Sequence, residues 1–159
     1  MIFSSPEELG RMGHRSSAGI DVGFCSGAFD LTTVGHAQFF KFCKSLCGVL
    51  VVMVGQDRQV RHLKGPTRPI MSERERVAMV SALRDVDHCF IDFWGRHDPT
   101  GLDEAFKLIA PARYFVSEET GHEDYRTRLC KQYGAVQIMV PRLEFADVST
   151  TNIIKRITT

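Results

Sequence analysis

The segment GAFDLTTVGH, residues 27–36, combines residue types that suit the binding of an anion. Gly27 lets the backbone leave the preceding apolar run tightly, and Gly35 lets a ligand approach the start of the next helix closely. Thr33 supplies a hydroxyl group. His36 supplies a ring N–H in the first helical turn, where unpaired backbone amides and the helix dipole attract negative charge. The pattern favours a phosphate-binding loop, although a simple helix cap with a packed histidine explains the same residues.

A second candidate segment is the basic stretch QDRQVRHLKGPTRPI, residues 56–70, which we predict to be irregular. The glycine and proline after Lys64 favour an ordered anion-binding loop, with a solvated surface loop as the alternative. Just beyond it, Ser72 and Glu75 have the spacing of a capping box, which predicts the start of a helix. The cations of the stretch, the densest cluster in the chain, are Arg58, Arg61, Lys64 and Arg68.

Apolar runs and helical patterns alternate along the chain and must position these segments. The runs predict strands at 21–27, 49–55, 88–93, 113–117 and 136–141. Helices are expected from Pro6 onward and at 36–46, 73–83, 100–110, 125–133 and 149–157. This alternation predicts an α/β fold, Rossmann-like and three-layered (α/β/α), with a five-stranded parallel sheet. We expect one domain over 1–159, with a helix and linker at 1–19. Ligands of such sheets bind at the carboxyl ends of the strands, where residues 27–36 fall.

The composition excludes several classes of protein. A net charge of +1 argues against a general nucleic-acid binder, which would carry a basic excess. The longest apolar run, CGVLVVMVG, is far shorter than the roughly 20 residues that span a bilayer. The five cysteines are scattered through apolar segments, as reduced and partly buried thiols are, and they form no set at zinc spacing. We therefore expect a cytoplasmic protein with neither a nucleic-acid nor a membrane partner and with no protein-bound metal.

Three segments resemble, in order, the motifs of the cytidylyltransferase-like nucleotidyltransferases. SGAFDLTTVGHAQFF, residues 26–40, resembles the signature loop G-x-F-D-x-x-H-x-G-H. VRHLKGPTRPIMSERER, residues 60–76, is similar to the lysine-bearing loop and following helix of the sugar-phosphate members. VSTTNIIKRI, residues 148–157, is similar to the terminal phosphate-binding helix start S-T-T-x-I-I. The likeness is greatest to the adenylyltransferase domain that makes ADP-heptose, followed by glycerol-3-phosphate cytidylyltransferase.

The resemblance implies an enzyme that transfers a nucleoside monophosphate from ATP or CTP to a phosphorylated sugar, polyol or small alcohol and releases pyrophosphate. It also implies a divalent ion, Mg²⁺, on the triphosphate, and a homodimer, which is common in the family. The implied catalytic residues are His36 and Thr33 at the nucleotide phosphates, Lys64 on the triphosphate and incoming phosphate, and Arg76 facing the site. The implied nucleotide-binding residues are Gly27, Ala28, Phe29, Asp30, Gly35, Arg142, Ser149, Thr150 and Thr151.

The chain departs from the family pattern at two places. Thr33 stands where the family has its first motif histidine. A T-x-G-H version occurs in the related phosphopantetheine adenylyltransferases, which lack the LKGP loop. After the fourth expected strand the chain has SEET, residues 117–120, where the sugar-phosphate members have a turn with glycine and aspartate. Glu118 and Glu119 would put carboxylates near an anion site. These departures motivate an alternative, a catalytically impaired relative that binds a nucleotide or a sugar phosphate.

Overall fold

The computed structural model of the chain describes residues 1–95, 100–118, 123–141 and 148–158. In these ranges it contains one five-stranded sheet, in which every pair of neighbouring strands is parallel and the order is β3-β2-β1-β4-β5. The predicted five-stranded parallel sheet is confirmed. Its strands are β1 (Val22–Gly27), β2 (Val49–Val54), β3 (His88–Ile91), β4 (Arg113–Ser117) and β5 (Val136–Val140).

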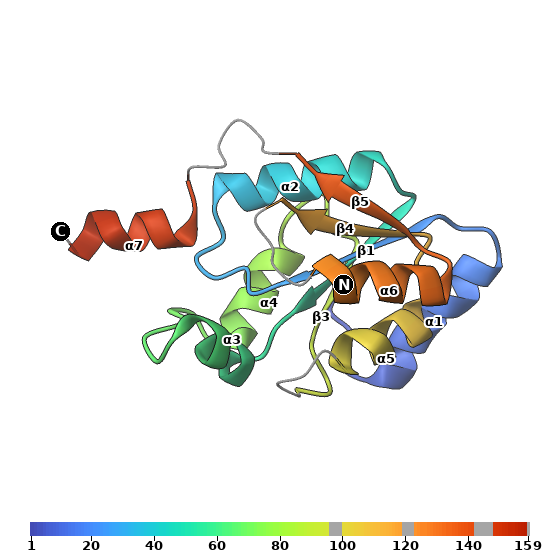
Figure 1. Ribbon diagram of the computed structural model, residues 1–159, viewed down its shortest axis with the longest axis horizontal. Coiled ribbons are helices and arrows are strands. Elements are labelled where there is room, and N and C mark those ends of the chain that lie inside the picture. The colour runs from blue at the N-terminus through green and yellow to red at the C-terminus, as the bar shows by residue number, and fades with distance from the viewer. Residues whose placement is uncertain (96–99, 119–122, 142–147, 159) are drawn as a thin grey trace.

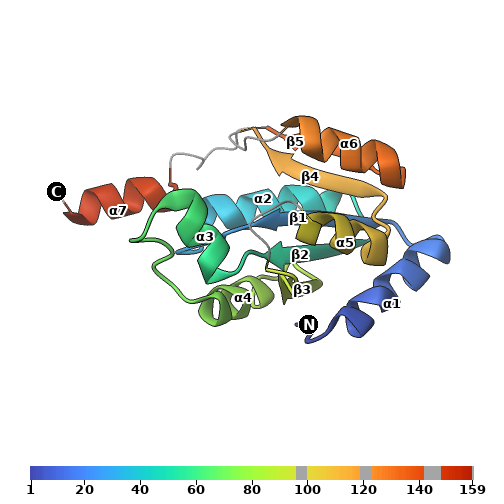
Figure 2. The same cartoon turned by 60° about the horizontal axis from the view of Figure 1, so that its bottom comes forward.

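Helices cover both faces of the sheet, so the predicted three layers are also confirmed (Figures 1 and 2). One buried cluster joins the sheet to α1, α5 and α6, and another joins it to α2 and α4. The described helices are α1 (Pro6–Ser17), α2 (Val34–Ser45), α3 (Asp57–Lys64), α4 (Glu73–Ser81), α5 (Thr100–Ile109), α6 (Glu123–Tyr133) and α7 (Thr150–Thr158).

The helix α3 corrects one expectation, because the basic stretch around it was predicted to be irregular. The side chain of Gln59 accepts the backbone N–H of Gln56 at 2.8 Å and so caps the first turn. Gly65 ends the helix with a φ of 95°, a left-handed conformation that glycine adopts readily. The strong amphipathic pattern of α3 buries Val60 and leaves its cations outside. Lys64 therefore lies at the end of an ordered helix.

The strand order places the segment after β1 at the point where the chain reverses its direction across the sheet. From β1 the chain moves outward through β2 to β3, and it then returns to β4 on the other side of β1. Such a switch point is where α/β sheets bind their ligands. The carboxyl ends of β4 and β5 point toward the end of the molecule at which α7 extends (Figure 1). This end of the sheet therefore gathers the residues that follow β1 and the start of α7.

The cysteines are unpaired and mostly buried, as expected for reduced thiols. The five cysteines are free, and four of them are fully buried. Burial raises the pKa of the Cys89 and Cys130 thiols to about 11. In the described part of the chain, no helix has the length and apolar character needed to cross a membrane.

Candidate active site

Residues 28–33 connect the carboxyl end of β1 to α2 and have an unusual backbone. Phe29 and Leu31 have φ values of 51° and 45°, a region that non-glycine residues rarely adopt. Phe29 is buried, and its ring lies over Gly27, where an added Cβ would approach the ring to 2.8 Å. Gly27 is needed because the Phe29 ring fills the space of a side chain there. Such strained backbone persists only where its surroundings hold it, and it clusters at functional sites.

Thr33 is the N-cap of α2, and the ring of His36 completes the cap. The backbone N–H of Thr33 donates to Nδ1 of His36 at 3.0 Å, and the Thr33 hydroxyl lies 3.1 Å from the same nitrogen. Because the amide can only donate, Nδ1 carries no proton and the neutral ring carries its proton on Nε2. The resemblance implies that the Thr33 hydroxyl contacts the nucleotide, whereas in this structure it faces the His36 ring.

His36 is held in the uncharged form. Burial, and after it the charge of Lys64, lowers the pKa of His36 to about 4, while Asp30 acts weakly in the opposite direction. The edge of the ring packs against Phe29, with 5.7 Å between the ring centroids. At neutral pH His36 is therefore a neutral ring with a donor N–H in the first turn of α2, where the backbone amides also favour an anion.

Asp30 ties the loop after β1 to the segment before α4. Its Oδ2 accepts the amide of Ile70 and Nε of Arg68, both at 2.9 Å, and its Oδ1 accepts the amide of Met71 at 3.0 Å. Burial raises the pKa of Asp30, but these bonds outweigh it and lower the pKa below its ordinary value. Both carboxylate oxygens are used inside the protein. Asp30 therefore positions the loop, and the nucleotide contact implied by the resemblance does not fit its carboxylate.

Arg76 also has a positioning role, which differs from the expected one. Its side chain is fully buried, so it does not face a substrate. Nε and Nη1 donate to the carbonyls of Met71 and Ala28 at 3.0 and 2.6 Å. Nη2 donates to the carbonyl of Gly55 and to Oδ1 of Asp57, each at 2.7 Å. Because all three guanidinium nitrogens are engaged, Arg76 joins the carboxyl ends of β1 and β2 to α3 and α4.

Lys64 ends α3 beside the loop after β1. Within the described ranges, its ammonium group takes part in no hydrogen bond or ion pair. Burial lowers the pKa of Lys64, and so does the nearby Arg68, while Asp30 opposes them. The charge of Lys64 in turn contributes to lowering the pKa of His36.

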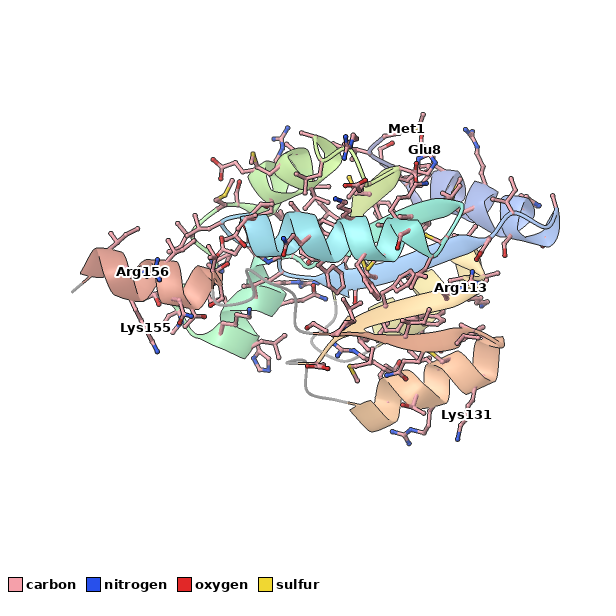
Figure 3. The ribbon with its side chains drawn as sticks, turned by 90° about the horizontal axis from the view of Figure 1, so that it is seen from above. Met1, Glu8, Arg113, Lys131, Lys155 and Arg156 are labelled. Atoms are coloured by element: carbon pink, nitrogen blue, oxygen red, sulfur yellow. The ribbon has the colours of Figure 1, made fainter. Side chains whose placement is uncertain are left out.

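The first turn of α7 lies against the same loop. The buried Thr150 donates its hydroxyl to the carbonyl of Asp30, and the Ser149 hydroxyl accepts the amide of Asn152 at 3.2 Å. Thr151 is exposed at the start of the helix. Figure 3 shows α7, with the labelled Lys155 and Arg156, at one end of the molecule and α2 running from beside α7 along the middle, while Arg113 and Lys131 lie toward the other end. Two helix starts therefore flank the loop.

The remaining candidates are placed as follows. Gly35 is the second residue of α2, between Thr33 and His36. Glu118 is exposed directly after β4. Arg142 lies outside the described residues, as do Glu119 and Thr120. The structure thus brings together the start of α2, Lys64 and the start of α7, and Asp30 and Arg76 hold these parts in place.

A hollow elsewhere in the molecule does not belong to this site. It has a volume of about 430 Å³ and is lined by residues of α1 and α5, among them Glu7, Arg11, His14 and Lys107. Because α1 and α5 end just before β1 and β4 begin, the hollow lies toward the amino ends of the strands. The loop after β1 lies at the opposite ends of these strands.

The chain was compared with known protein families. Residues 24–156 match the family described as cytidylyltransferase-like. The chain belongs to this family. One curated relative, the bifunctional protein HldE of Granulibacter bethesdensis, is 33 % identical over 145 residues, which cover 89 % of this chain and 28 % of that protein. The chain thus spans little more than a quarter of the length of the curated relatives that it matches.

Two solved structures have a fold similar to that of this chain. The lipopolysaccharide core biosynthesis protein of Thermoplasma volcanium has a TM-score of 0.63 and 23 % sequence identity, with 77 % of this chain and 96 % of that one covered. Pantoate-beta-alanine ligase of Francisella tularensis has a TM-score of 0.62 and 16 % identity, with 99 % of this chain and 77 % of that one covered. At such identities the likeness concerns the Rossmann-like fold.

The sequence did not indicate that Arg68 is buried and paired, unlike the neighbouring arginines. It grouped Arg68 with Arg58 and Arg61, which the pattern leaves indistinguishable. In the structure Arg58 and Arg61 are at the surface, whereas Arg68 is buried and paired with Asp30. Asp30 in the signature loop could have indicated a buried cation nearby, because a buried carboxylate needs a partner. The sequence does not indicate which of the basic residues pairs with it.

Proposed function

We propose that this protein is a nucleotidyltransferase, which transfers a nucleoside monophosphate from ATP or CTP to a phosphorylated sugar, polyol or small alcohol and releases pyrophosphate. The observation that carries the proposal is the neutral His36 ring, whose Nε2–H lies in the first turn of α2 near the Lys64 ammonium. Membership of the cytidylyltransferase-like family supports it. The resemblance also implies a cytoplasmic homodimer, which sedimentation velocity of the purified chain tests.

In this reaction an acceptor phosphate oxygen forms a bond to the α-phosphorus of the nucleotide. The bond from that phosphorus to the bridging oxygen breaks, and pyrophosphate leaves with the electron pair. Reactions of this kind need positioning and positive charge more than covalent chemistry. His36 donates Nε2–H to a non-bridging α-phosphate oxygen as negative charge grows there. Lys64 neutralises charge on the departing pyrophosphate, and the amides and hydroxyls at the start of α7 bind its oxygens.

A divalent ion such as Mg²⁺ belongs to this proposal as a companion of the triphosphate. Among the side chains that the structure describes, no group of three or more histidine, cysteine, aspartate or glutamate residues is arranged to hold a metal. Asp30, the carboxylate of the signature loop, already accepts three hydrogen bonds from protein donors. We therefore assign no step of the reaction to a metal held by these residues.

A screen for pyrophosphate release tests the proposed function. ATP and CTP are each combined with phosphorylated sugars, with glycerol 3-phosphate and with phosphorylated small alcohols, in the presence of Mg²⁺. We expect release with one nucleotide and a narrow set of acceptors, and none when the acceptor is omitted. Absence of release with every pair, together with measurable nucleotide binding, would favour the catalytically impaired relative.

That alternative rests on Thr33, which removes a donor that the family pattern provides. If the alternative holds, Thr33→His restores turnover that the natural chain lacks. If the natural chain is active, Thr33→His gains nothing, because the Thr33 amide and hydroxyl already orient His36.

A further inference from the structure

Arg68 is fixed against the signature loop by an ion pair. The residue is 8 % exposed, and its Nε donates to Oδ2 of Asp30 at 2.9 Å. The amides of Ile70 and Met71 also donate to the Asp30 carboxylate. Asp30 therefore orients the guanidinium group through Nε and makes no second bond to it.

One nitrogen of this guanidinium lacks an acceptor. Nη2 of Arg68 is buried and has no hydrogen-bond partner in the described part of the chain. A buried donor without a partner costs free energy, so native structures almost always supply one from protein, water or a ligand. The planar fork of arginine fits two oxygens of a carboxylate or a phosphate. The free nitrogen of Arg68 therefore calls for an anionic acceptor.

The surroundings of Arg68 favour a phosphate with more than one negative charge. The ammonium of Lys64 is near enough for Arg68 to lower its pKa, and the carboxylate that opposes this effect is Asp30. Thr150 bonds to the carbonyl of the same Asp30, so the start of α7 adjoins this pair of cations. Two neighbouring cations and a helix start repel one another unless an anion lies between them.

We propose that Arg68, together with Lys64, binds the pyrophosphate portion of the nucleoside triphosphate, with Nη2 donating to a phosphate oxygen. This inference rests on the proposed function and assigns a substrate group to a residue within it. Pro66 and Thr67, which directly precede Arg68, are exposed, and a phosphate reaches the buried Nη2 only if this loop shifts. Arg68 thereby couples the anion to the signature loop through its bond to Asp30.

Calorimetric titration with inorganic pyrophosphate tests this assignment. Arg68→Met removes the charge and all of the guanidinium donors, and Arg68→Lys keeps a charge able to pair with Asp30 but offers no planar fork. The matched control is Arg84→Met, because Arg84 is an exposed arginine beyond α4, toward the amino end of β3. Urea unfolding of each variant shows whether it is folded, and Arg68→Lys decides the matter if Arg68→Met is not.

We expect pyrophosphate to bind at least about tenfold more weakly to both Arg68 variants, the scale of one lost bond to a charged group, and to bind the control like the natural chain. Unchanged binding in the folded Arg68 variants overturns the proposal, as does failure of the natural chain to bind pyrophosphate. A parallel titration with glycerol 3-phosphate tests the other source of phosphate, and a loss confined to that ligand overturns the triphosphate assignment. Pyrophosphate binding does not require turnover. If pyrophosphate binds in a way that depends on Arg68 but no nucleotidyl transfer is observed, only the transferase proposal is overturned.

Discussion

His36 is part of the N-cap of α2 and also keeps a hydrogen-bond donor on Nε2. In an ordinary capping box a glutamate or glutamine at the third helical position accepts the amide of the N-cap residue. Here Nδ1 of His36 accepts the amide of Thr33. A glutamate in that place would put negative charge beside a bound phosphate, whereas the imidazole keeps a donor on Nε2. One side chain thus both caps α2 and offers a hydrogen bond to an anion.

The ring of His36 should not titrate in the physiological range. Its pKa of about 4 in the folded chain lies below the ordinary value of 6.5, so the ring stays neutral from pH 5 to pH 8. As the pH falls, the unfolded chain binds this proton first. The stability that neutral His36 contributes is thus present above pH 6.5 and is lost as the pH falls toward 4. NMR titration of the ring C–H signals checks the pKa, and a midpoint near 6.5 contradicts the account.

Lys64 should matter for turnover and hardly at all for folding. Replacing it with alanine removes the cation that, in the proposed reaction, faces the departing phosphates, and we expect kcat/KM to fall by about 100-fold or more. The free energy of unfolding should change by less than about 0.5 kcal/mol, because burial and Arg68 already oppose the charge of Lys64. Steady-state kinetics and urea unfolding measure the two effects. Lys41→Ala, at an exposed position of α2, is the control, and equal losses of activity and stability in Lys64→Ala would mean a structural role.

At the scale of the elements, the site depends on two buried arginine connections. Arg76 of α4 bonds to the carbonyls that follow β1 and β2, and Arg68 bonds to the loop after β1. The Arg76 bonds satisfy carbonyls that the parallel sheet leaves open at its carboxyl edge, whereas Arg68 bonds to the side chain of Asp30. The two arginines therefore hold the loop after β1 against α3 and α4.

Replacing Arg76 with alanine should destabilise the fold. The change leaves three carbonyls and the Asp57 carboxylate without their donor, and breaking a buried charged contact from one side typically costs roughly 3 kcal/mol or more. Arg74→Ala is the matched control, because Arg74 is exposed on the same helix and should change stability by less than about 0.5 kcal/mol. Urea unfolding compares the two. If Arg76→Ala unfolds like Arg74→Ala but loses activity, Arg76 contacts the substrate after all.

At the scale of the whole molecule, most of the fold followed from the sequence because each strand is a short apolar run between helical patterns. The central strand β2 reads VLVVMV, which only a strand covered on both faces explains simply. The helix α3 was missed because it is short and basic and because a pair of glutamines caps it instead of the usual serine, threonine or aspartate.

The location of the candidate site could be predicted from the sequence, but the roles of its individual residues could not. Residues 27–36 were expected at the carboxyl end of β1, and they lie there. The buried bonds of Arg76 and Asp30 depend on contacts between segments far apart in the chain, so the resemblance alone made both look like ligand-binding groups. The direction in which the Thr33 hydroxyl points likewise depends on the rotamer of His36.

The most direct test of the proposed reaction is ³¹P NMR of the mixture that the pyrophosphate screen identifies. The account predicts that a pyrophosphate signal and a diphosphodiester signal from the product grow together in equal amounts, and that both are lost with His36→Ala while Lys41→Ala keeps them. Growth of orthophosphate or nucleoside diphosphate in their place, or equal product formation by His36→Ala, would contradict it.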